Sequence, residues 1–206
     1  ILDTDADRLW DVWESNDGDY TGITHTGTDP NNADTDGDGL KDGDEILGTL
    51  AGLDLPALGA HPVLKDIFLE IDWAGDATGG SHTHEPSVES VQMLIDAFAA
   101  SPAVNPYGLP PGIRLHVDHG QGGVFTGGNF VGNDGLIGFD DEFNVYKAAN
   151  FNPLREDLFH YTIFCHAFNS GGNSGIAELP GDDFIVASDV WYGNALRVAT
   201  VCMHEL

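Results

Sequence analysis

The sequence predicts an α+β fold, in which a mixed sheet with packed helices follows an acidic segment with little regular structure. From residue 63 onward, strand-like and helix-like segments follow one another in the order strand, helix, strand, several strands, helix. Residues 1–60 instead hold 15 acidic and two basic residues and no long apolar periodicity. Pro56, Gly59 and Pro62 interrupt the chain between these parts. We therefore expect two domains, 1–60 and 61–206, with the boundary near residues 55–62.

The first elements of the larger segment are a strand and a helix. Residues 64–72 are rich in β-branched and aromatic residues, which is typical of a strand. Residues 85–100 carry an apolar stripe at helical spacing, with Pro86 at an early position and Glu85 and Glu89 near the positive N-terminal end.

The remaining elements are expected to be mostly strands. Residues 113–118 alternate between apolar and polar side chains, as in a half-buried strand. Residues 120–138 contain eight glycines but no phosphate-binding signature, so they are expected to form a long surface loop. Three further strands over residues 159–168, 174–179 and 183–188 and a final helix from near Asn194 complete the prediction.

Composition excludes several classes of protein. The chain has 206 residues, with 34 acidic against seven basic ones and a formal net charge of −27. Binding to nucleic acid or to an anionic membrane surface requires clustered Lys and Arg, so neither is expected. No apolar run reaches the roughly 18 residues of a membrane span. A hydrophobic share of 41% is too high for a disordered acidic tail.

An internal repeat with an offset of 31 residues lies in the acidic segment, between residues 3–14 and 34–45. In both copies Asp occupies positions 1, 3, 5 and 9, Leu occupies position 7 and Glu occupies position 12. This is the ligand spacing of a twelve-residue calcium loop, in which position 7 supplies its backbone carbonyl and the glutamate at the last position supplies two oxygens. The predicted calcium ligands are Asp3, Asp5, Asp7, Leu9, Asp11 and Glu14 in the first loop, and Asp34, Asp36, Asp38, Leu40, Asp42 and Glu45 in the second.

The first loop is expected to bind calcium more weakly than the second. Position 6 of a calcium loop makes a sharp turn that favours glycine, and Gly39 occupies it in the second copy. The first copy has Arg8 there, which predicts backbone strain and a cation near the metal. The alternative for both copies is a solvated acidic linker, although carboxylates held about 5 Å apart repel one another by somewhat under 1 kcal/mol per pair even in water.

Residues 28–45, TDPNNADTDGDGLKDGDE, resemble the bacterial form of thrombospondin type 3 repeats. The resemblance covers about the first quarter of the chain. It implies a calcium-wrapped spacer on a secreted or cell-surface protein. The first copy departs from the pattern at Ala6 and Arg8, which leaves its calcium occupancy open.

Other histidines and the cysteines permit more than one interpretation. His82 and His84 form an H-x-H that could chelate a metal or lie in a solvated loop. His116 and His119 need a turn between them to share a metal, and packing is the default for His160 and His166. Cys165 and Cys202 are either two buried thiols or one disulfide.

The pair His204-Glu205 ends an apolar helix, which is how an H-E-x-x-H zinc site begins. Residues 175–187 and 199–206 resemble the region that leads into the zinc helix of secreted bacterial metalloproteases of the metzincin type, and residues 64–73 and 113–120 resemble the first strands of that domain. The resemblance implies a twisted five-stranded sheet and an edge strand, here residues 174–179, that binds an extended protein or peptide substrate. It also implies His204 as the first zinc ligand and Glu205 as the general base.

We therefore expect a calcium-binding, zinc-dependent extracellular endopeptidase, secreted or at the cell surface, whose chain stops within the active-site helix. Zinc would bind only if the missing ligands follow Leu206, so the 206-residue chain is expected to be inactive. The alternative is a non-enzymatic, calcium-dependent adhesion or cell-surface binding module in which His204-Glu205 is incidental. A further alternative is a zinc site built from His82, His84 and His204.

Overall fold

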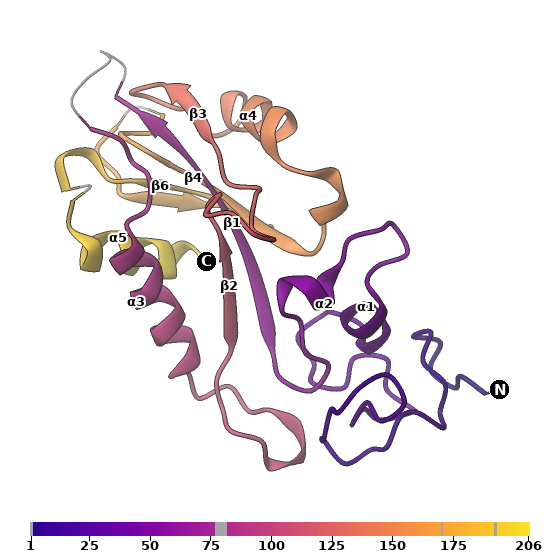
Figure 1. Ribbon diagram of the computed structural model, residues 1–206. Coiled ribbons are helices and arrows are strands. Elements are labelled where there is room, and N and C mark those ends of the chain that lie inside the picture. Colours follow the sequence, from indigo (N-terminus) through magenta and orange to yellow (C-terminus); the bar gives the residue numbers. More distant parts are fainter. Residues whose placement is uncertain (1, 77–81, 170, 192) are drawn as a thin grey trace. The chain divides into compact units, whose positions relative to one another are not determined.

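The computed structural model describes residues 2–76, 82–169, 171–191 and 193–206 (Figure 1). The chain forms two compact units, the first from residues 1–67 and 97–116 and the second from residues 68–96 and 117–206. The predicted domain limits, 1–60 and 61–206, remain a prediction.

In unit one, no helix or strand is assigned to the described residues before α1 (Asp42–Leu47). A short helix, α2 (Leu55–Leu58), packs against α1. It begins after Asp54, whose carboxylate accepts a hydrogen bond from the Ala57 backbone N–H (3.1 Å). The unit also contains the end of α3 (Val88–Ala99), the 3-10 turn η1 (Pro106–Gly108) and the starts of β1 (Asp66–Gly75) and β2 (Arg114–Asp118).

The sheet is mixed, which confirms the α+β class. Its strand order is β2-β1-β4-β6-β5, with β4 (Phe159–Cys165), β5 (Gly175–Ala177) and β6 (Asp183–Ala187). The pairs β1–β4 and β4–β6 are parallel, whereas β5 pairs antiparallel with β6 at the end of this order. All five residues of β6 are buried, as expected for a strand covered on both faces.

Some elements were not predicted, and others were predicted to be longer than they are. A sixth strand, β3 (Phe130–Asn133), pairs parallel with β1 from within the glycine-rich segment, so the prediction of a loop throughout 120–138 was wrong. The helix α4 (Glu142–Asn150) and the 3-10 turn η2 (Pro153–Arg155) follow it. The strand predicted over 159–168 ends at Cys165, and Cys165 and Cys202 are both buried and unbridged.

Glycines 127 and 128 allow the glycine-rich segment to close over a buried charge cluster in unit two. Their backbone N–H groups donate to Asp118 (2.9 and 3.3 Å). Asp118 also pairs with Arg155 (2.7 Å), which in turn pairs with Glu70. A Cβ at Gly127 would overlap the Arg155 and Glu70 side chains. The glycines therefore provide the close approach of the backbone that this cluster needs.

The C-terminal helix, α5 (Ala195–Glu205), packs on β5 and β6. It begins as predicted, because the Asn194 side chain accepts a hydrogen bond from the Arg197 backbone N–H (3.1 Å). The short 3-10 turn η3 (Asp189–Trp191) connects β6 to this region.

Candidate metal sites

The two acidic loops of unit one have matching hydrogen bonds around the Asp at position 1. In each loop this carboxylate accepts from the backbone N–H groups at positions 4 and 6, and the Asp at position 5 accepts from the N–H of the Leu at position 7. The sequence repeat is therefore also a repeat of backbone conformation. These bonds join Asp3 to Ala6 (2.8 Å) and Arg8 (3.2 Å) and Asp7 to Leu9 (2.7 Å) in the first loop, and Asp34 to Gly37 (2.8 Å) and Gly39 (3.0 Å) and Asp38 to Leu40 (2.8 Å) in the second.

The Asp at position 9 closes each loop onto the Thr at position 2. Asp11 accepts from the backbone N–H (2.8 Å) and the hydroxyl (2.7 Å) of Thr4. Asp42 accepts the same pair of bonds from Thr35 (2.9 and 2.6 Å). Both Asp residues therefore hold the loop closed, a role that the ligand spacing alone did not predict.

Arg8 adopts the strained conformation that the sequence predicts, with a φ of 86°, and Gly39 has a φ of 100° at the same position. The Arg8 guanidinium binds groups that lie outside the first loop. Nη2 donates to the carbonyls of Gly43 (2.8 Å) and Gly48 (2.7 Å) and pairs with Asp44. Weaker calcium binding by the first loop stays a prediction.

The carboxylates of the second loop gather in two overlapping groups. Asp34, Asp36 and Asp38 each place a ligand atom within 4.8 Å of the others, and so do Asp38, Glu45 and Asp66. Asp66 lies outside the twelve-residue loop, at the start of β1, and sequence reasoning missed it.

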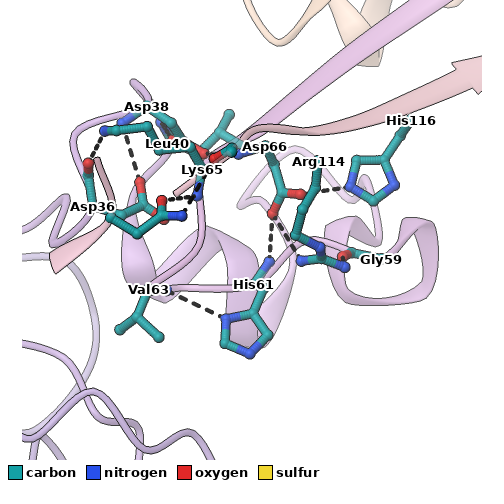
Figure 2. A network of polar contacts seen from close by, with 12 residues as sticks. Asp36, Asp38, Leu40, Gly59, His61, Val63, Lys65, Asp66, Arg114 and His116 are labelled. Carbon is teal, nitrogen blue, oxygen red and sulfur yellow. Dashed lines mark hydrogen bonds and ion pairs between the residues drawn. The ribbon is translucent and has the colours of Figure 1, made fainter. Parts of the chain in front are cut away.

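Asp66 is held in place by neighbours in unit one (Figure 2). Its carboxylate lies 2.5 Å from His116 Nε2, accepts from the His61 backbone N–H (2.8 Å) and pairs with Arg114 (3.3 Å). Its own backbone N–H donates to Asp38 (2.7 Å). His116 therefore contacts a carboxylate of unit one.

Several carboxylate oxygens of these two groups are buried with no hydrogen-bond partner among the described residues. These oxygens are the two of the Glu45 carboxylate and one of the Asp36 carboxylate. Burial, followed by the neighbouring carboxylates, raises the pKa of Glu45 to about 11 and that of Asp36 to about 8. Glu45 is only 2% exposed, so water does not solvate its carboxyl group. A divalent cation would supply the missing partner.

The first loop has a similar group. Asp3, Asp5 and Asp7 each place a carboxylate oxygen within 4.8 Å of the others. The same is true of Asp7, Glu14 and Asp42. Both oxygens of Asp5 and one oxygen each of Asp7 and Glu14 are buried with no hydrogen-bond partner among the described residues. Burial, followed by the charges of Asp7 and Asp5, raises the pKa of Glu14 to about 7. Asp42 of the second loop thus lies beside the carboxylates of the first loop.

The pair His204-Glu205 lies in the last turn of α5 in unit two. His204 is exposed, and the Glu205 side chain lies against β5, where a Cβ at Gly175 would overlap its carboxylate. Since β5 is the last strand in the order of the sheet, its outer edge is not paired within the described residues. An acidic group thus lies beside the edge strand that the sequence singled out.

No protein-family model, curated protein or solved structure matches the chain. Among the described residues, no helix combines the length and the apolar character that a membrane crossing requires.

Proposed function

We propose that unit one is a calcium-binding module of a secreted or cell-surface protein, with one ion in each acidic loop. The observation that carries this proposal is the set of buried carboxylate oxygens that converge without a hydrogen-bond partner among the described residues. In the second loop, Glu45 presents two such oxygens and Asp36 a third. The energetic cost of burying several negative charges together is removed if a cation binds between them.

The donor set favours calcium over other ions. The two overlapping groups of the second loop together offer the carboxylates of Asp34, Asp36, Asp38, Glu45 and Asp66, and the loop pattern adds the carbonyl of Leu40. Calcium accepts 6–8 such oxygens in flexible geometry, whereas magnesium retains several waters and needs a near-octahedral arrangement. Zinc favours nitrogen and sulfur ligands, which these groups lack among the residues named.

Isothermal titration of the chelator-treated chain tests this proposal. We expect two calcium ions per chain, with Kd values near 10⁻⁴–10⁻³ M as for extracellular modules, and an increase in thermal stability on binding. A titration without calcium uptake over this range, together with identical melting curves in calcium and in chelator, would refute it.

As a second function, we propose that unit two belongs to a zinc endopeptidase of the metzincin type. The supporting observation is that Glu205 lies against Gly175 in the antiparallel edge strand β5. An extended peptide that added a strand to this edge would pass its backbone near a carboxylate able to accept a proton from water. The rival is a non-enzymatic adhesion module in which this proximity has no chemical role.

Zinc would contribute Lewis-acid polarisation and a lowered pKa of bound water. A catalytic zinc needs three protein ligands, and the motif in this chain provides only His204. We therefore expect no protease activity from the 206 residues alone. The test is a longer chain that includes the residues encoded after Leu206. Cleavage of casein that is lost in Glu205→Gln would support the peptidase, whereas an immediate stop codon or a chain without Gly-His at this point would support the adhesion module.

A further inference from the structure

Three histidines from two distant parts of the sequence, residues 82–84 and residue 166, lie close together in unit two. His82 and His84 precede α3, and His166 directly follows β4. One potential ligand atom of each lies within 4.8 Å of those of the other two. The ring centroids are 5.0 Å apart for His82–His84, 5.7 Å for His82–His166 and 5.6 Å for His84–His166. Three imidazoles bound to one tetrahedral zinc at about 2.0–2.1 Å would have centroids roughly 5 Å apart.

The backbone explains why His82 and His84 face the same way. Thr83 forms an antiparallel bridge with Gly75 at the end of β1, and the His84 backbone N–H donates to the Ala74 carbonyl (3.1 Å). The segment is therefore extended, and alternate side chains point to the same side. Thr83 is exposed while His84 is buried, in agreement with this alternation. The H-x-H motif thus presents both rings towards His166.

Neighbouring groups orient two of the rings as in metal sites. His84 Nδ1 lies 2.5 Å from the Ser188 hydroxyl, which itself donates to the Cys165 carbonyl (3.4 Å). The hydroxyl therefore accepts from Nδ1–H, and the lone pair of His84 is on Nε2. His166 Nε2 lies 3.3 Å from the Asp189 carboxylate, so its Nδ1 is the ligand candidate. In metal sites, a hydrogen bond to the ring nitrogen that does not bind the metal fixes the tautomer of the histidine.

We propose that His82, His84 and His166 form a zinc site distinct from the acidic loops and from His204. Imidazole nitrogen is a preferred zinc ligand, whereas the hard, oxygen-binding calcium ion disfavours it. The ion would tie residues 82–84 to the end of β4. His166 and Asp189 also line a surface pocket, which gives an ion a path to the site.

The protonation state agrees with this geometry. Burial, followed by the nearby charges of His82 and His166, lowers the pKa of His84 to about 4. The ring is therefore neutral at physiological pH, which is the form that ligates a metal.

The test uses the 206-residue chain, stripped of metal and held in saturating calcium so that the acidic loops are filled. Titration with zinc should show a single tight ion per chain, and cobalt(II) in its place should give the visible absorption of a tetrahedral site. His166→Gln and His82→Gln should each abolish both signals. His204→Gln is the matched control and should bind zinc as the unmodified chain does.

A positioning role for Ser188 provides an independent measurement. Ser188→Ala removes the group that orients His84 and should weaken zinc binding by roughly 10–100-fold while the cobalt spectrum remains tetrahedral. Retention of the calcium-induced thermal shift shows that each variant is folded. The proposal is overturned if the unmodified chain binds no zinc, if His82→Gln and His166→Gln bind it unchanged, or if only His204→Gln loses it. Because calcium uptake is measured separately, failure here is distinct from failure of the calcium module.

Discussion

Glu45→Gln separates a ligand role of Glu45 from a packing role. The glutamine has nearly the same shape but carries no charge. Without calcium, the pKa of about 11 means that Glu45 is already protonated near neutral pH, so the substitution should change stability by no more than about 0.5 kcal/mol. With calcium, the substitution removes the ligand that would supply two oxygens, so the stabilisation by the ion should be lost.

The size of the effect follows from mass action. At a calcium concentration 100 times Kd, binding to the second loop stabilises the folded chain by about 2.7 kcal/mol. If the substitution weakens binding by about 100-fold, only about 0.4 kcal/mol remains. For a chain of this length, the loss corresponds to a fall in Tm of roughly 5–9 °C in calcium.

The assay is thermal unfolding in calcium and in chelator for three proteins. Asp19→Asn is the matched control, because Asp19 is an exposed acid of the same unit and the change removes the same charge. We expect Asp19→Asn to keep the full calcium shift and Glu45→Gln to lose most of it. An equal fall of Tm in calcium and in chelator would show that Glu45 acts through packing, and an undiminished calcium shift would refute the site.

Three further predictions concern other parts of the molecule. In chelator, burial raises the pKa of Asp36 to about 8 and that of Asp38 to about 6, so the folded state holds more protons than the unfolded state. The contribution of these two acids to stability is full below about pH 4 and is lost as pH rises towards 8. Calcium binding opposes this loss, so the calcium-induced Tm shift should grow with pH over the same range, and a shift that does not change with pH would contradict the prediction. Arg155→Met leaves Glu70 and Asp118 buried without their cation and should destabilise the chain by about 3–5 kcal/mol in urea unfolding, and a loss below 1 kcal/mol would contradict the buried cluster. Gly175→Ala places a Cβ in the space of the Glu205 carboxylate, which is the far end of a flexible side chain, so that side chain should move aside and the free energy of unfolding in urea should change by no more than about 0.5 kcal/mol; a loss above about 2 kcal/mol would show that Glu205 is held rigidly against β5.

The sequence was sufficient to predict the elements whose apolar pattern is local. β1, α3 and α5 were predicted to within a few residues, because strand composition, helical periodicity and the Asn194 cap are properties of neighbouring residues. β3 was missed because its four residues, Phe-Val-Gly-Asn, lie among glycines and are paired only through contact with β1. Its strand character comes from the partner and not from its own composition.

The same distinction applies to the candidate sites. The twelve-residue spacing predicted which acids gather in each loop, but Asp66 and His166 enter their groups from far along the chain. No local pattern marks either residue. Asp66 becomes a neighbour of Asp38 because its backbone N–H donates to that carboxylate, and His166 reaches His84 because parallel pairing aligns the ends of β1 and β4. Such contacts depend on the folded topology.

The first loop shows how a sequence can depart from a motif and still keep its shape. Ala6 and Arg8 adopt left-handed conformations (φ 63° and 86°) where the second loop has glycines (75° and 100°). Each non-glycine residue in this region costs of order 1–2 kcal/mol. Arg8 offsets part of this cost through its bonds to two backbone carbonyls and to Asp44, which no glycine could make. The arginine therefore ties the first loop to α1, and this tie explains how the loop retains its conformation without glycine at either position.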